Sequence, residues 1–184
     1  MCSSKARPAR AASSPWTSGQ YGILAFATHG LISGELNGLD EPALALTVPE
    51  QASAGDDGLL TASEVALLNL NADWVILSAC NTASGDGRPG ADGLSGLARA
   101  FFVAGSRALL VSNRPVFSDA AAEVTTRMIE RLRSDPALRR SEALRLSMLN
   151  LLDDGSMPEH MAHPAAWAPF VVVGDGAALR ARDP

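Results

Sequence analysis

The 184-residue chain has few cysteines, few aromatic residues and no long apolar run. Its two cysteines, Cys2 and Cys80, predict no disulfide framework and favour a reducing cytoplasm. No apolar run approaches the roughly 20 residues of a membrane-spanning helix, so no membrane partner is predicted. Basic residues are also scarce: 15 Lys and Arg face 20 Asp and Glu. This acidic balance gives no electrostatic reason to expect nucleic acid as a partner.

What is present indicates one globular domain. The chain is 47% hydrophobic and 19% charged, which is typical of a soluble protein with a proper core. The domain is expected at residues 21–176, with a short tail at 177–184. Residues 1–20 hold basic residues but no acid, which is compatible with a transit peptide. Because they lack an amphipathic pattern, a disordered tail or a misassigned start is the preferred interpretation.

Four apolar runs of strand length divide the chain. Continuous runs of this kind suit strands that are buried on both faces of a parallel sheet. The sequence predicts these strands at 21–28, 73–79, 107–112 and 169–173. The stretch 31–48 is interrupted by glycine and proline, so it is predicted to be a turn or hairpin with a short extra strand at 43–48.

Helical signals lie between these runs. Residues 61–64 (Thr-Ala-Ser-Glu) are a capping box that opens a helix to about Leu68. Apolar spacing predicts a second helix ending at Gly105, a third, and a fourth from Asp135-Pro136 to Gly155. The apolar positions of these last three helices are Leu94, Leu97, Ala98 and Phe101; Ala121, Val124, Met128 and Leu132; and Leu144, Met148 and Leu151. Strands alternating with helices predict an α/β sandwich with a mostly parallel sheet.

Two side chains with catalytic potential follow the first two long strands. His29-Gly30 comes after strand 21–28, and Cys80 comes after strand 73–79. Because functional groups of α/β sheets gather beyond the carboxyl ends of the strands, both emerge at one edge if these strands are neighbours. A thiol, with an ordinary pKa of roughly 8.5, needs a base such as histidine to ionise near neutral pH. The backbone N–H groups of Gly30 and Cys80 can donate to a developing oxyanion.

A structural interpretation of the same residues stays open. A lone cysteine at the end of a buried strand is more often an inert core thiol, and a histidine before glycine is usually a loop residue. The spacing of His29 and Cys80 is 51 residues (80 − 29), which resembles the roughly 50 residues between the caspase histidine and cysteine. The residues alone support the catalytic and the structural interpretation about equally.

Six segments, in order, resemble the CHAT domain family, a bacterial family that is similar to caspases and separases and often follows tetratricopeptide repeats. The segments are Phe26–Gly30 (FATHG), Asp57–Glu64 (DGLLTASE), Leu77–Thr82 (LSACNT), Gly93–Phe101 (GLSGLARAF), Ala104–Ser112 (AGSRALLVS) and His163–Phe170 (HPAAWAPF). This resemblance implies a caspase-like three-layer α/β/α sandwich with a mostly parallel sheet. It assigns the roles of general base to His29 and nucleophile to Cys80.

Three features depart from the family pattern. Family members usually have further strands and helices before the histidine strand, where this chain has a polar tail, and no repeat domain is seen here. Asn113-Arg114-Pro115 places arginine where members commonly have tryptophan, beside the pocket for the residue that precedes the cut. Arg114 is therefore a candidate substrate-binding residue that would favour an acidic or polar side chain. The alternative is that Arg114 points into solvent.

Two functions are supported. The first is a cysteine endopeptidase that cuts a protein substrate and needs no cofactor or metal. The second is a non-catalytic signalling or scaffold module, or an inactive fragment. A tetratricopeptide-repeat region or a partner chain is a further expected partner. His160 and His163 are spaced like a metal pair, but no cysteine or carboxylate set completes a site, so no metal centre is predicted. His163 is expected to anchor the last strand.

Overall fold

The computed structural model describes residues 21–46, 57–78 and 96–179, and the predicted tail at 1–20 lies outside these ranges. The elements run in chain order as β1 Ile23–Phe26, β2 His29–Leu31, β3 Ala43–Ala45, β4 Leu59–Thr61, α2 Ala62–Ala66, β5 Trp74–Leu77, α3 Gly96–Val103, β6 Ala108–Ser112, α4 Ser118–Ser134, α5 Arg140–Asp153, α6 Glu159–Ala162, α7 Pro164–Trp167 and β7 Phe170–Gly174. No helix within the described residues is long and apolar enough to cross a membrane.

The main sheet has four strands in the order β1-β5-β6-β7. The pairs β1–β5 and β5–β6 are parallel, and β7 pairs antiparallel with β6. Strands β1, β5 and β6 lie within predicted apolar runs, and β7 lies in the fourth run but extends one residue beyond it, to Gly174. Every residue of β5 and of β6 is buried, as expected for continuous apolar runs with both faces covered. The mostly parallel α/β sheet is therefore confirmed.

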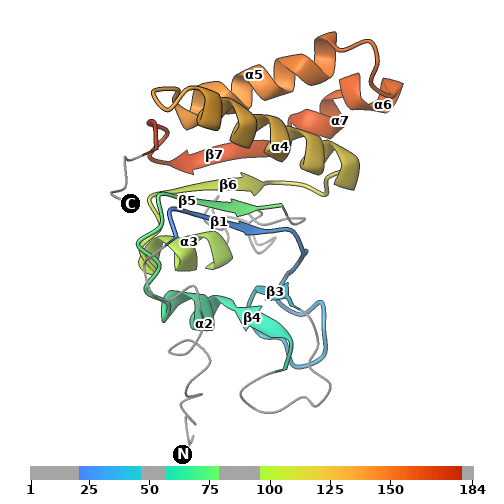
Figure 1. Cartoon of the computed structure of the whole chain (residues 1–184). Coiled ribbons are helices and arrows are strands. Elements are labelled where there is room, and N and C mark those ends of the chain that lie inside the picture. The colour runs from blue at the N-terminus through green and yellow to red at the C-terminus, as the bar shows by residue number, and fades with distance from the viewer. Residues whose placement is uncertain (1–20, 47–56, 79–95, 180–184) are drawn as a thin grey trace, which may run out of the picture.

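Helices cover both faces of this sheet and make three layers (Figure 1). Helices α4 to α7 lie over one face, and α2 and α3 lie over the other. Alternate residues of β5 serve the two layers: Trp74 and Ile76 pack with α4 and α5, whereas Val75 and Leu77 pack with α3. Burial of these side chains fixes β5 at the centre of the domain. The arrangement matches the expected α/β/α sandwich.

A second, smaller sheet lies beside the first and has the order β2-β3-β4, with both pairs antiparallel. The extra strand predicted at 43–48 is confirmed at Ala43–Ala45; residues 47 and 48 lie outside the described ranges. Gly34 and Gly38 in the β2–β3 connection have φ angles of +82° and +83°, which only glycine adopts without strain. The strand predicted at 21–28 is shorter than expected, because β1 ends at Phe26 and His29 opens β2.

The capping box is confirmed: the Thr61 side chain accepts from the Glu64 N–H, and the Glu64 carboxylate accepts from the Thr61 N–H. Gly105 ends the α3 region with a φ of +100°. The predicted start of the fourth helix is wrong. Asp135 is the C-cap of α4, and its carboxylate accepts from the Ala137 N–H to form a turn, so α5 begins only at Arg140. Helices α6 and α7 were not predicted.

A buried arginine in α5 forms hydrogen bonds with the backbone at the end of β7. Arg140 is 1% exposed, and its guanidinium donates to the backbone oxygen of Asp175 at 3.0 and 2.5 Å. The Asp175 carboxylate also pairs with Arg107, just before β6, at 2.5 Å. The pKa of Asp175 is lowered, mostly by the hydrogen bond from the Ala177 N–H and next by the hydrogen bond from Arg107. A single acidic residue thus connects β6, β7 and α5.

We expect Asp175→Asn to destabilise the fold at neutral pH more than at acidic pH. The folded-state pKa of Asp175 is lowered, so its carboxylate stabilises the fold above the ordinary pKa of about 4, and this contribution is lost as pH falls through the lowered value. Thermal unfolding at pH 7, 5 and 3 would measure the effect, with Asp153→Asn, at an exposed position of α5, as the control. An equal loss of Tm at all three pH values would contradict this account.

Candidate active site

The predicted catalytic residues are related by the register of the main sheet. Ile23 pairs with Trp74 and Phe26 with Leu77, so β1 and β5 are offset by 51 residues (74 − 23). This offset equals the spacing of His29 and Cys80. Both residues follow their strand's last paired residue by three positions. The sequence spacing of the two residues is thus the register of two neighbouring parallel strands.

The same rule extends to the third strand. Val75 pairs with Leu109 and Ile76 with Leu110, an offset of 34 residues (109 − 75). Adding this offset to the position of Cys80 gives Arg114. The three residues singled out from the sequence therefore follow three adjacent parallel strands at equivalent positions, and neighbouring strands lie about 4.8 Å apart. The arrows of β1, β5 and β6 all point to the same side of the domain (Figure 1).

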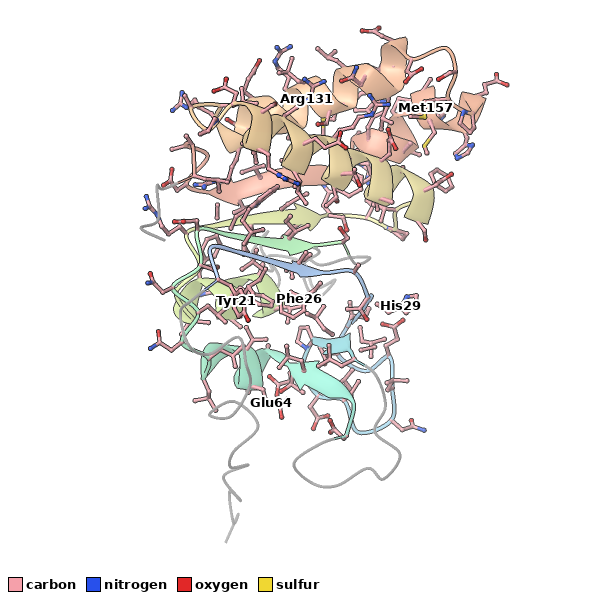
Figure 2. All side chains as sticks on the ribbon, viewed as in Figure 1. Tyr21, Phe26, His29, Glu64, Arg131 and Met157 are labelled. Carbon is pink, nitrogen blue, oxygen red and sulfur yellow. The ribbon has the colours of Figure 1, made fainter. Side chains whose placement is uncertain are left out.

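His29 lies where the chain passes from the main sheet to the small sheet. It is exposed, and its ring points away from the core beyond the end of β1 (Figure 2). The backbone of His29 pairs with Ala45 and that of Gly30 with Leu44, both in β3. The Thr28 hydroxyl donates to the Ala45 carbonyl. The main chain around His29 is therefore fixed by β3, while the imidazole forms no hydrogen bond or ion pair with a described residue.

Cys80, including its backbone N–H, lies outside the described residues. The last described residue before it is Ser78, two positions earlier. Ser78 is firmly placed, since its N–H donates to the Phe26 carbonyl at 3.1 Å and its hydroxyl lies 3.2 Å from that of Thr125 in α4. Neither Ser78 nor Thr125 is among the site residues predicted from the sequence. The signal that could have marked Ser78 is a serine that follows the apolar run Trp74–Leu77 and ends the strand.

Arg114 is exposed in the five-residue loop that joins β6 to α4. This loop begins at Asn113, whose N–H donates to the Pro169 carbonyl at 3.1 Å, and it ends at Phe117, the N-cap of α4. The exposure of Arg114 fits a residue that faces either a substrate or solvent, so its expected role stays a prediction.

The two C-terminal histidines have separate structural roles. His160 Nε2 lies 2.8 Å from an Asp119 carboxylate oxygen, and its ring packs edge-on against Phe117 with 5.5 Å between centroids. His163 is the N-cap of α7, where its Nδ1 accepts from the Ala165 N–H at 3.1 Å. In the described part of the chain, no group of three His, Cys, Asp or Glu residues that could hold a metal is found.

We expect a thiol introduced by His29→Cys to be cross-linked to Cys80 by a short bis-maleimide. The reason is that β1 and β5 are neighbouring parallel strands, and each of the two residues follows its strand's last paired residue by three positions. The experiment uses a Cys2→Ser background, and peptide mass spectrometry measures the yield of the linked pair. Ser33→Cys, an exposed position beyond β2, is the matched control. A yield no higher than that of the control would contradict the proximity.

The comparisons with known proteins agree with the resemblance seen in the sequence. A family model described as CHAT domain matches residues 7–175. Tetratricopeptide repeat protein 28 of Mus musculus is 28% identical over 172 residues, a match that covers 85% of this chain. The chain spans only 7% of that relative's length. The sequence resembles a family expected to be bacterial, whereas this relative is a mouse protein. With the family model matching most of its length, the chain belongs to the CHAT domain family.

Proposed function

We propose that this domain is a caspase-like cysteine endopeptidase in which His29 is the general base and Cys80 the nucleophile. The observation that carries the proposal is the common offset of 51 residues, in the β1–β5 register and between these two residues. An exposed imidazole beside a thiol is the arrangement that activates cysteine near neutral pH. The proposed substrate is a protein, and no cofactor is assigned.

The proposed reaction has two stages. In the first, His29 takes the Cys80 proton, and the sulfur attacks the scissile carbonyl carbon to form a C–S bond. The N–H groups of Gly30 and Cys80 are proposed to hold the resulting oxyanion. The His29 proton then passes to the leaving amine nitrogen, and the C–N bond breaks. In the second, His29 takes a proton from water, whose oxygen attacks the thioester carbon. The C–S bond then breaks, the His29 proton passes to the sulfur to restore the thiol, and the acid product is released and loses its own proton to solvent.

A second candidate function is a non-catalytic signalling or scaffold module. The observation that favours it is the place of the matching segment in its mouse relative, where it is 7% of a protein named for tetratricopeptide repeats. In that case a repeat region or another chain would be the partner. The scarcity of cysteine supports a cytoplasmic location for either function. The two functions differ in whether Cys80 is reactive.

We expect Cys80 to be alkylated faster than Cys2 near pH 7, because an adjacent imidazole raises the thiolate fraction. Limited iodoacetamide labelling followed by mass spectrometry compares the two thiols in the folded protein. His29→Ala should slow labelling of Cys80 about tenfold. The matched control is His163→Asn, which removes an imidazole but retains a capping side chain at the start of α7.

The same variants separate peptidase from scaffold. New protein N-termini in a cell extract should appear with the wild type and disappear with Cys80→Ala and His29→Ala. If Cys80 reacts no faster than Cys2, or if His29→Ala leaves its labelling unchanged, the peptidase proposal fails and the scaffold function is favoured.

We further expect Arg114 to favour an acidic residue immediately before the cut, because its permanent charge forms paired hydrogen bonds with a carboxylate. Cleavage of a peptide library by the wild type and by Arg114→Trp tests this. In the variant, the preference for Asp and Glu over uncharged residues should fall about tenfold. This is the change expected when the free energy of one charge-assisted hydrogen bond is lost. Identical profiles, or a wild type that prefers Lys or Arg, would show that Arg114 faces solvent.

A further inference from the structure

The loop that carries Arg114 has few contacts of its own. Among residues 113–117, only Val116 is partly buried, and the other four are exposed. Phe117 is the N-cap of α4 and makes no side-chain hydrogen bond to the helix. Phe117 therefore supplies no side-chain acceptor for the first N–H groups of α4. Val116 anchors the middle of the loop, because it packs against the core cluster formed with α4 and α5. The exposed residues on either side of Val116, Arg114 among them, depend in addition on contacts at the two ends of the loop.

Those contacts come from the segment that precedes β7. At the start of the loop, the Asn113 N–H donates to the Pro169 carbonyl at 3.1 Å. At its end, the His160 ring packs against the Phe117 ring with 5.5 Å between centroids and an angle of 72°. His160 Nε2 also lies 2.8 Å from Asp119 in the first turn of α4. Both ends of the loop are thus held by residues between α6 and β7.

The ionisation of Asp119 determines which residue donates the proton in its contact with His160. A carboxylate in the first turn of a helix is favoured by the helix dipole, and Asp119 also accepts from the Ala120 N–H at 2.9 Å. The hydrogen bond from His160 and that from Ala120 lower the pKa of Asp119. The carboxylate can only accept, so the proton in this contact belongs to His160 Nε2. His160 therefore supplies the donor that joins α6 to the start of α4.

Helix α6 does not depend on His160 for its own place. Met161 is 4% exposed and packs with Ala120 and Ala166 in a small apolar cluster. His160, in contrast, is 45% exposed. Removing its imidazole should leave α6 attached to α4 while releasing the Phe117 end of the loop.

We propose that His160 is a positioning residue that holds the 113–117 loop, and with it Arg114, at the edge of the substrate pocket. This proposal rests on the peptidase function proposed above and deepens it. The substrate concerned is a peptide with an acidic residue before the cut. His160 acts through Phe117 and Asp119 and does not touch the substrate.

The test measures selectivity at Cys80 without a natural substrate. Two tripeptide ketones with a leaving group on the terminal carbon alkylate the cysteine, one with Asp and one with Ala next to the ketone. His160→Ala should slow the Asp probe about tenfold and leave the rates of the Ala probe and of iodoacetamide unchanged. His160→Gln should restore most of the Asp rate, because its amide can still donate to Asp119. Arg145→Ala, which breaks an exposed pair with Glu142 on α5, is the control.

Hydrogen exchange of the backbone amides, in the same variants, follows the loop itself. His160→Ala should speed exchange at Arg114, Val116 and Phe117 and leave β6 unchanged. Unchanged loop exchange, or an equal loss with both ketone probes, would overturn the proposal. A wild type whose Cys80 reacts no faster than Cys2 would instead overturn the peptidase function on which the proposal rests, and hydrogen exchange would still decide whether His160 holds the loop.

Discussion

The parallel pairing of β1, β5 and β6 is the constraint on which the rest of the site depends. Because side chains alternate between the two faces of a strand, a shift of one residue would exchange the core face with the opposite face along a whole strand. Burial opposes such a shift. Trp74 is 0% exposed in one layer, and Phe26 packs against Phe101 in the other with 5.4 Å between ring centroids. Once these large side chains fix the register, the ends of β1, β5 and β6 are fixed relative to one another, and His29 and Arg114 follow from those ends.

Strands β5 and β6 could be predicted from the sequence because burial on both faces requires a continuous apolar run, which few other elements of this length show. The end of β1 could not, because the run continues to Thr28 although the chain turns after Phe26. That turn depends on pairing with Ala43–Ala45, a contact between distant parts of the sequence. Asp135-Pro136 resembled a helix start, yet Asp135 both ends α4 and forms the next turn. The local sequence at Asp135-Pro136 is compatible with either a helix start or a turn, and the packing of α5, which begins at Arg140, determines which of the two forms.

The candidate site was predictable in a similar, partial way. The sequence places His29, Cys80 and Arg114 after strands, and the register explains their spacing. The residues that support them carry weaker signals. Thr125 lies within a helix whose pattern indicates only a buried face, and its contact with Ser78 connects α4 to the strand that leads to Cys80. His160 was considered as a metal ligand because of its spacing from His163, but three-dimensional contact with Asp119 and Phe117 assigns it to the start of α4.

The contacts described above are of two kinds. Apolar contacts in the core fix where each strand and helix lies, and polar contacts nearer the surface fix how individual side chains and loops are oriented. Changes to Trp74, Ile76 or Leu110 would act on the whole fold, since each lies in the core between sheet and helices. Polar contacts such as Ser78 with Thr125 and His160 with Asp119 lie outside these apolar clusters, the first between the end of β5 and the middle of α4, the second at the start of α4. A substitution of one of these polar residues removes one hydrogen bond that orients a side chain or loop, and it leaves the sheet in place. Under the proposed function, the β6–α4 loop, which contacts His160 of α6 at one end and Pro169 at the other, is where such a change would alter substrate selectivity.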